Sequence, residues 1–246
     1  MIFSDRSKVY GQDVDMNGLL RPAVLLAKME DAGGRQMEAF PPSNEDLRAQ
    51  NLAYVLSRVV LRIYSDVPEG AQVEAQTFAG SDSRGLSYMR YYRMLLDGET
   101  VAEAVSTWAL LDFKQNKLIR VGQVEAFGAE ADTPFALDLP SRFALPDAAH
   151  FAEVGKRKVL FSDCDRNRHL NNTKYLAILC DFVDGIEHRR LRGANISFVS
   201  QAPYQTELTV FRADEGEKVY FKLLLPDGKL CAEAALYFEG RVKSEE

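Results

Sequence analysis

Two stretches of the chain, DVDMNGLLRPAVLLAKMED at residues 13–31 and DCDRNRHLNNTKYLAILCD at residues 163–181, resemble each other along their length. Both place Asp, Asp and Asn at alternate positions and then continue into an apolar run. The offset between matching residues is 150 throughout. Self-similarity at a fixed offset indicates a repeated structural unit, so these two stretches decide how the rest of the chain is interpreted.

Two further matches follow in the same order, and their offsets shrink smoothly to 135 and then 130 residues. Three ordered matches are hard to obtain by chance, so we predict a tandem duplication of one fold. The later matches join Ser65 and Pro68 to Ser200 and Pro203, and LLDGETVAEA (95–104) to LPDGKLCAEA (225–234).

The duplication predicts two copies, residues 1–120 and 150–246, joined by a linker. Residues 121–149 hold three prolines among alanine and acidic residues, and a structureless stretch of this length is unusual inside a compact domain. Asp97-Gly98 and Asp227-Gly228 indicate hairpin turns. We therefore predict that each copy folds as an α+β unit, in which one helix covers a mostly antiparallel sheet.

The expected elements follow the same order in each copy, with a strand, a polar turn, a helix and then four longer strands. The first copy gives a strand at Lys8–Val14, a helix at Arg21–Ala39, and strands at Ala53–Tyr64, Ala71–Ala79, Leu86–Leu96 and Thr100–Phe113. The second gives a strand at Arg157–Ser162, a helix at Thr173–Gly185, and strands at Ala194–Ser200, Glu207–Arg212, Lys218–Leu225 and Leu230–Glu239.

Composition excludes several classes of protein. Of 246 residues, 46% are hydrophobic, too many for a mainly disordered chain, and no apolar run is long enough to span a membrane. The polar N-terminal sequence lacks the apolar core of a signal peptide, so we expect a cytoplasmic protein. The net charge of −6 argues against nucleic acid. Three cysteines without a CxxC pair argue against disulfides or zinc, and we expect neither metal nor cofactor.

The richest polar segment is FSDCDRNRHLNNTKYL at residues 161–176. Asp163, Asp165, Asn167 and His169 alternate, so an extended backbone would place them on one face, and the segment must curl for them to cooperate. An imidazole beside carboxylate and amide groups suits proton transfer. Asn172 is the expected N-cap of the following helix, whose first N–H groups could face an oxyanion.

Three alternatives compete for this segment. Calcium is rejected, because the twelfth loop position, which needs Glu, is Val24 in the first copy and Lys174 in the second. A capped helix without chemistry is the expectation for the first copy, where Leu19 stands in place of His169. A cysteine nucleophile is disfavoured, because alternation places Cys164 opposite the polar face.

The pattern Asp165-x-Asn167-x-His169-x-Asn171-Asn172-x-x-Tyr175 resembles the signature of the acyl-acyl carrier protein (acyl-ACP) thioesterases. NLAYVLSRVVLRI (51–63) and STWALLD (106–112) resemble the N-terminal half of the same family. The resemblance implies two tandem hotdog domains, each a long helix wrapped by an antiparallel sheet. It also implies hydrolysis of the thioester between a fatty acyl chain and acyl carrier protein, which would end fatty acid synthesis.

The resemblance assigns a role to each matching residue. Asp165 would orient or activate water, Asn167 would hold that water or the carbonyl, and His169 would transfer the proton. Asn171, Asn172 and Tyr175 would contact substrate. One departure stands out, because Gln201 occupies a position where the family often carries Glu, and an amide cannot act as a general base.

The resemblance also places the acyl chain in the first copy, where the apolar helix residues Val24, Leu25, Leu26 and Met29 are candidate lining. Acyl carrier proteins are acidic, so a basic docking surface is expected. Its candidates are Lys156–Lys158, Arg166, Arg168 and His188–Arg192. A coenzyme A thioesterase, a degenerate acyl-binding protein and, less readily, a hotdog hydratase are alternatives. A homodimer is one way to close an exposed sheet edge.

Overall fold

A computed structural model describes residues 2–81, 87–120 and 137–239. The chain divides into two compact units, Met1–Asp138 and Leu139–Glu246, and each is described by itself. The division lies inside the expected linker, of which residues 121–136 are outside the described ranges. Residues 143–151 belong to the second unit, where Phe143, Leu145 and Phe151 pack on the cluster of Ala213, Tyr220 and Ala235.

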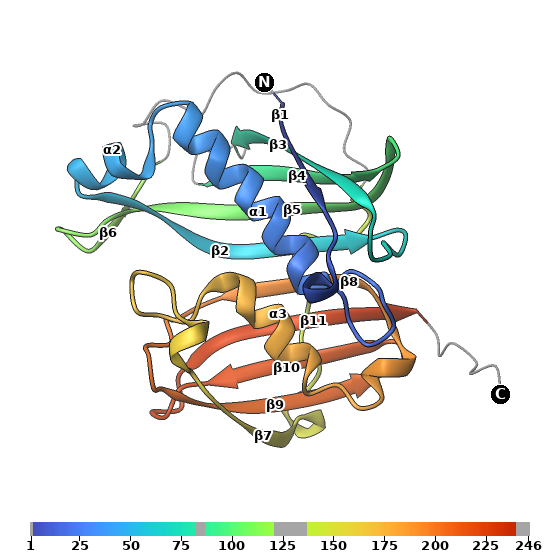
Figure 1. The fold of residues 1–246 in the computed structure, drawn as a ribbon. Coiled ribbons are helices and arrows are strands. Elements are labelled where there is room, and N and C mark those ends of the chain that lie inside the picture. Colours follow the sequence, from blue (N-terminus) through green and yellow to red (C-terminus); the bar gives the residue numbers. More distant parts are fainter. Residues whose placement is uncertain (1, 82–86, 121–136, 240–246) are drawn as a thin grey trace. The chain divides into compact units, whose positions relative to one another are not determined.

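The first unit is a curved antiparallel sheet with one long helix on it (Figure 1). The strands follow the order β1-β3-β4-β5-β2, with β6 paired to β5. Helix α1 contacts β1, β3 and β4. The elements are β1 (Phe3–Lys8), a 3-10 turn (Gly11–Asp13), α1 (Pro22–Ala39), α2 (Asn44–Ala49), β2 (Leu52–Ile63), β3 (Gln72–Ser81), β4 (Tyr88–Leu96), β5 (Glu99–Asp112) and β6 (Lys117–Ile119).

The second unit repeats this plan with a shorter helix. Its strands follow the order β7-β9-β10-β11-β8, which is the order of the first unit when each strand is replaced by its counterpart. The elements are β7 (Ala152–Lys158), α3 (Asn172–Cys180), β8 (Arg190–Phe198), β9 (Glu207–Glu215), β10 (Lys218–Leu224) and β11 (Leu230–Glu239), with 3-10 turns at Ala148–His150, Phe161–Asp163 and Ile186–His188. The shared order supports the predicted duplication.

Local sequence signals explain most of the elements. Pro22 occupies the first position of α1, where a missing N–H is harmless. Asp97 and Gly98 both have positive φ (52° and 86°) in the tight turn between β4 and β5, as their sequence predicts. The predicted helix and strand positions are confirmed for α1, β2 through β5 and β9 through β11, within a few residues.

Three predictions about the elements are wrong. The strands expected at Lys8–Val14 and Arg157–Ser162 end at Lys8 and Lys158. Beyond each strand the backbone enters a 3-10 turn, which Asp13 or Asp163 closes by accepting an amide hydrogen bond from the residue three positions earlier. Helix α3 ends at Cys180 rather than Gly185. Arg212 is the physical reason, since it donates to the Phe182 carbonyl and the Asp184 carboxylate, both at 2.6 Å.

The core of each unit lies between the helix and the sheet. Leu25, Leu26 and Met29 of α1 are 2% exposed or less, and Leu176 and Leu179 of α3 are fully buried. Burial of one such side chain stabilises the fold by about 1.5–3 kcal/mol. None of the described helices has the length and apolar character that crossing a membrane requires.

Candidate functional site

The polar segment of the second unit forms a tight turn between β7 and α3. The Asp165 amide donates to the His169 carbonyl at 2.9 Å, and the Arg168 amide donates back to the Asp165 carbonyl at 3.0 Å. Arg168 has a φ of 64°, a left-handed conformation that an L side chain adopts at a cost. Cys164 and Leu170 form a β-bridge that closes the base of the turn.

Asp165 and Asn167 hold this turn together. Oδ1 of Asp165 accepts the Asn167 amide at 2.8 Å and the His169 amide at 3.4 Å, while Oδ2 accepts Nδ2 of Asn167 at 3.1 Å. Carboxylates that accept backbone N–H groups in this way stabilise turns. The structure therefore brings together three of the predicted catalytic residues, Asp165, Asn167 and His169.

Asp163 has a different position and a different role. Its buried carboxylate accepts two bonds from Arg157, at 2.8 and 3.0 Å, and one from the Leu160 amide at 2.8 Å. The segment curls, as expected if its polar residues are to cooperate: it is a 3-10 turn followed by a tight turn, so Asp163 does not share the face of an extended strand with Asp165, Asn167 and His169. Asp163 and Arg157 form a charge-compensated link inside the unit.

His169 has a ring nitrogen that makes no hydrogen bond with the described residues. Its ring is half-buried, and Nδ1 is enclosed without a hydrogen-bond partner among the described residues. Its backbone bridges Pro203, and the Leu170 amide donates to the Ala202 carbonyl at 2.8 Å. These contacts place the β8–β9 loop, with exposed Gln201, beside the turn. This nitrogen therefore has hydrogen-bonding capacity that no described residue uses.

The start of α3 differs by one residue from the prediction. The N-cap is Asn171, whose side-chain oxygen accepts the Thr173 amide at 2.9 Å, and the expected N-cap Asn172 is the first helical residue. Asn caps a helix from the residue that precedes it, and both positions here are Asn. Tyr175 is only 3% exposed, and its hydroxyl lies 3.3 Å from Sγ of Cys231. Its side chain therefore packs in the core of the unit.

The first unit contains the same turn without the imidazole. The Asn17 amide donates to Asp15 Oδ1 at 2.8 Å, and Gly18 takes the left-handed conformation with a φ of 72°. Leu19 occupies the position of His169, as the repeat alignment predicts. The repeat also pairs Gln201 with Asp66.

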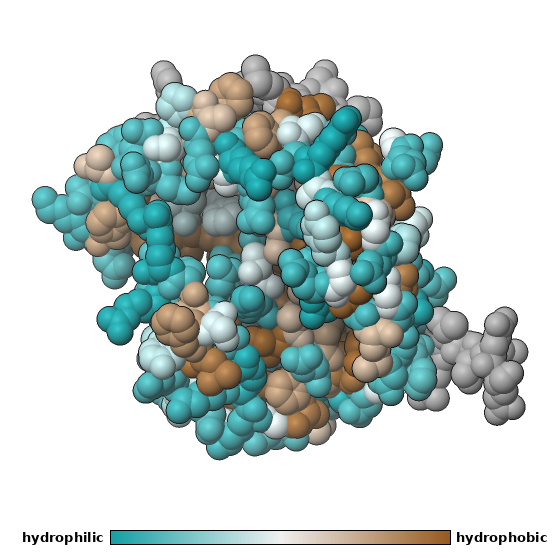
Figure 2. Space-filling view, in the orientation of Figure 1, coloured by the Kyte–Doolittle hydropathy of each residue, from teal (hydrophilic) through white to brown (hydrophobic). Residues whose placement is uncertain are grey.

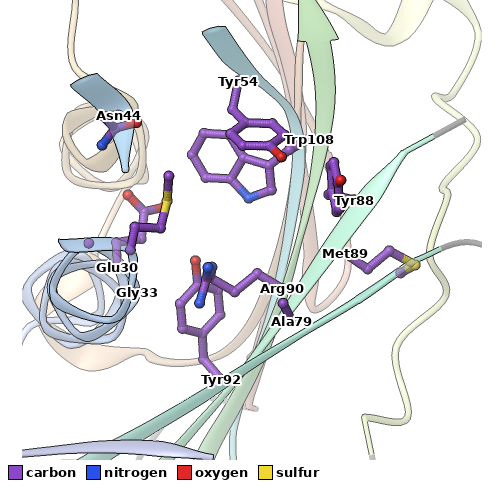
Figure 3. A pocket seen from close by; sticks show the side chains of 12 residues that line it. Glu30, Gly33, Asn44, Tyr54, Ala79, Tyr88, Met89, Arg90, Tyr92 and Trp108 are labelled. Atoms are coloured by element: carbon purple, nitrogen blue, oxygen red, sulfur yellow. The ribbon is translucent and has the colours of Figure 1, made fainter. Parts of the chain in front are cut away.

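The first unit holds a cavity of about 220 Å³ between α1 and the sheet (Figure 3). The predicted helix lining is wrong in detail, because Leu25, Leu26 and Met29 are core residues and Val24 is also not part of this cavity wall. The helix instead contributes its following turns. The walls are Glu30, Gly33, Gly34 and Met37 of α1, Asn44 of α2, Tyr54 of β2, Ala79 of β3, Tyr88, Met89, Arg90 and Tyr92 of β4, and Trp108 of β5. No sequence motif marks the polar members of this wall, which come from separate elements.

Hydrophobic side chains reach the surface of the second unit among hydrophilic ones (Figure 2). Phe161 is 85% exposed and Val199 57%, and both flank the turn or the adjoining β8–β9 loop. Arg166 and Arg168, also exposed, make no ion pair with the residues that the structure describes. The predicted basic groups at Arg157 and Arg192 are already engaged, by Asp163 and Glu239 respectively.

Metal ligands and cysteine thiols were compared with the requirements of a metal site or a thiol nucleophile among the described residues. No three His, Cys, Asp or Glu side chains in them gather as a metal ion requires. All three cysteines are free thiols, and burial raises the pKa of Cys180 to about 12, which keeps it protonated.

Both units have the architecture of hotdog domains, a helix wrapped by an antiparallel sheet, and solved structures confirm the fold. The chain is similar to an acyl-ACP thioesterase from Bacteroides thetaiotaomicron, with 20% identity and a TM-score of 0.85 over 97% of this chain and 98% of that one. It is also similar to the 12:0-ACP thioesterase from Umbellularia californica, with 14% identity and a TM-score of 0.80 over 97% of each chain.

The chain belongs to the acyl-ACP thioesterase family. Residues 1–125 match the N-terminal domain model of that family, and residues 148–238 match its C-terminal domain model. A curated relative, the chloroplastic palmitoyl-acyl carrier protein thioesterase of Arabidopsis thaliana, is 24% identical over 165 residues. That match spans 63% of this chain and 40% of the relative.

Proposed function

We propose that this protein hydrolyses the thioester of fatty acyl-ACP, releasing the fatty acid and ACP. Family membership supports the reaction class. The observation that carries the assignment to a site is His169, whose enclosed Nδ1 lacks a partner among the described residues and whose counterpart in the first unit is Leu19. Release of free fatty acid would end fatty acid synthesis, which we place in the cytoplasm.

The mechanism that fits this site is attack by water with His169 as the proton carrier. His169 takes a proton from water as the oxygen attacks the thioester carbonyl carbon. The C–S bond then breaks, and the proton passes to the departing phosphopantetheine sulfur. Asp165 sets the geometry of the turn through the His169 amide, and Asn167 offers its exposed amide to the carbonyl or the water.

Gln201 is assigned a supporting role. Its exposed side chain lies in the loop that bridges to His169, and it can donate and accept hydrogen bonds but cannot remove a proton. We infer that proton removal falls to His169, which Asp165 positions through the turn. Asn171, Asn172 and Tyr175 then act by fixing the start of α3, with Asn171 and Asn172 open to substrate contact.

The two units would divide the work. We propose that the cavity of the first unit, whose lining lies within the predicted copy 1–120, holds the acyl chain, because its aromatic walls can bury methylene groups. The second unit, which contains the predicted copy 150–246, would supply the hydrolytic turn. The predicted linker, residues 121–149, would connect the two copies, with its last residues packed on the second unit. A homodimer stays a prediction.

Arg166 and Arg168 are proposed to meet the acidic carrier protein. Both are exposed, both flank His169 in the turn, and neither is ion-paired with a described residue. Charges of this kind speed association and select partners more than they add affinity. The double variant Arg166→Glu, Arg168→Glu should weaken acyl-ACP hydrolysis and spare acyl-CoA hydrolysis, with Lys229→Glu as a surface control.

The experiment that tests the function measures fatty acid release from acyl-ACPs of varied chain length and from matched acyl-CoAs. His169→Ala is the test variant and Leu19→Ala, at the equivalent position, is the matched control. Release that His169→Ala abolishes and Leu19→Ala preserves supports the proposal. A clear preference for acyl-CoA would assign the same chemistry to another substrate. Absence of His169-dependent release from every substrate would leave an acyl-binding protein.

A further inference from the structure

The cavity of the first unit contains two ionisable side chains that storage of a plain hydrocarbon chain does not need. Glu30 enters from α1 and Arg90 from β4, and aromatic rings surround them (Figure 3). Arg90 is only 6% exposed. Buried charge opposes folding unless it is compensated, so its presence in a cavity wall calls for a reason.

Arg90 is built into the wall by its neighbours. A Cβ at Gly33 would lie 2.9 Å from Cδ of Arg90 and 3.3 Å from Cε1 of Tyr92, so the glycine makes room for both side chains. The guanidinium donates to the Gln36 side-chain oxygen and, at 3.3 Å, to the Thr77 hydroxyl, both neutral acceptors. Arg90 is therefore a fixed donor group at the surface of the cavity.

Glu30 faces the same cavity with a carboxyl group that changes state near neutral pH. Burial, and secondarily Asp31, raises the pKa of Glu30 to about 7. Arg90 and Glu30 shift the pKa of Tyr92 in opposite directions after the dominant effect of burial, which places both charges near its hydroxyl. A carboxylate accepts hydrogen bonds and a carboxylic acid also donates one, so Glu30 can pair with either partner type.

Two further polar groups of this wall, on Tyr92 and Trp108, are engaged within the protein. The Tyr92 hydroxyl pairs with Ser106 Oγ at 3.2 Å, and the Trp108 indole N–H donates to the same oxygen at 2.6 Å. Tyr54 and Tyr88 pack edge to face with centroids 5.0 Å apart. Their rings present apolar surface, and Glu30 and Arg90 add two ionisable groups to this largely aromatic wall.

We propose that the first unit binds an acyl chain that carries a hydroxyl group, with Arg90 donating a hydrogen bond to the hydroxyl oxygen and the Glu30 carboxylate accepting a hydrogen bond from the hydroxyl. This inference rests on the proposed thioesterase function and names its substrate class. A hydroxyl has both the acceptor that Arg90 needs and the donor that a Glu30 carboxylate needs. A plain acyl chain would remove water from Glu30 and Arg90 without replacing its hydrogen bonds. A carboxylate on the chain would be repelled by the negative charge of Glu30. A keto oxygen accepts hydrogen bonds but has no hydrogen to donate to Glu30.

The test compares acyl-ACPs of equal length with and without a hydroxyl, the hydroxyl being moved along the chain. We expect at least about a tenfold higher kcat/KM for one hydroxylated series, the value of a charge-assisted hydrogen bond. Arg90→Met should abolish the preference and Glu30→Gln should reduce it. Arg35→Met and Glu38→Gln remove the same groups at exposed positions of α1 and should keep the preference.

A binding measurement separates this inference from the hydrolysis proposal. Calorimetric titration of hydroxylated and plain free fatty acids into the His169→Ala protein reports on the cavity even if no acyl-ACP is hydrolysed. Circular dichroism and the midpoint of thermal unfolding check that Arg90→Met is folded, and Arg90→Lys serves if it is not. Equal affinity for both acids, tighter binding of the plain acid, or a preference that persists in a folded Arg90 variant would overturn the inference.

Discussion

The turns at residues 13–21 and 163–171 share their backbone hydrogen bonds but differ in side chains. Asp15 and Asp165 each accept the amide two residues later at 2.8 Å. The Leu20 amide donates to the Val67 carbonyl and the Leu170 amide to the Ala202 carbonyl, both at 2.8 Å. Five positions differ: Val14 against Cys164, Met16 against Arg166, Gly18 against Arg168, Leu19 against His169 and Arg21 against Asn171.

This comparison separates structure from chemistry within one motif. Asp and Asn occur in both turns because the turn needs them, so their presence alone does not mark an active site. The imidazole occurs in one turn only. We infer that His169 is the residue that most distinguishes the proposed active site. Asp165 and Asn167 also stabilise the turn.

The helices of the two units differ in a second instructive way. Helix α1 has 18 residues and α3 has 9, and the extra turns of α1 carry Gly33, Gly34 and Met37 of the cavity wall. Glu30 of α1 corresponds to Cys180 at the end of α3. The longer helix therefore supplies part of the cavity wall in the first unit, whereas the proposed hydrolytic turn lies in the second unit.

The largest expected effect comes from making the two turns alike. His169→Leu, which copies the first unit, should lower kcat for acyl-ACP hydrolysis by about 10²- to 10⁴-fold, the usual contribution of an acid–base group. The measurement is fatty acid release at saturating substrate. Leu19→Ala should change kcat little. Retention of full activity in His169→Leu would remove the imidazole from the mechanism.

The next largest effect is the pH dependence of the unfolding free energy, which Glu30 and its counterpart Cys180 should influence differently. The pKa of Glu30 is raised from 4.5 to about 7 by burial, so the folded state holds the proton longer than the unfolded state. Stability should therefore fall as pH rises from about 5 to 8, by at most about 3 kcal/mol. Chemical denaturation at each pH measures this. Glu30→Gln should flatten the profile.

Cys180 supplies the contrast for that profile. Its thiol, with a pKa of about 12, stays neutral over the same range, so Cys180→Ala should leave the slope with pH unchanged. If Glu30→Gln keeps the wild-type slope, another group carries the pH dependence.

A smaller effect tests the shared duty of the turn carboxylates. Asp15→Ala and Asp165→Ala should each lower the unfolding free energy by about 1–2 kcal/mol, because each removes bonds to backbone amides. Only Asp165→Ala should also reduce hydrolysis. The two variants are compared by urea denaturation and by activity. A stability loss in one turn alone would show that the turns are not equivalent.

The smallest effect concerns the left-handed residue of each turn. Arg168→Gly should raise the unfolding free energy by about 0.5–1 kcal/mol, since glycine tolerates positive φ. Gly18→Ala should lower it by about 1 kcal/mol. Thermal unfolding measures both. Effects of the same sign in the two variants would contradict the backbone argument.

The sequence predicted those features that neighbouring residues determine. The repeat, the Asp97-Gly98 turn and the extent of α1 follow from local patterns. The end of α3 did not, because it depends on Arg212, which is 28 residues from its partner Asp184. The turn residues Asp165, Asn167 and His169 were identified from their spacing and the family resemblance.

The cavity wall was beyond sequence reasoning for a related reason. Glu30 and Arg90 lie on different elements, and only the packing of α1 on β4 brings them to one cavity. A charged residue on the apolar side of a helical pattern, as at Glu30, is the one local signal that was available.

Gly33 gives this protein a short mutational path to a new cavity. One nucleotide change converts a glycine codon to an alanine codon, and the added Cβ would lie 2.9 Å from Cδ of Arg90. The guanidinium would have to move, and the cavity would change shape. The proposed hydrolytic turn belongs to the other unit and is encoded more than 100 residues downstream, so under this proposal ligand preference could evolve while the reaction is retained.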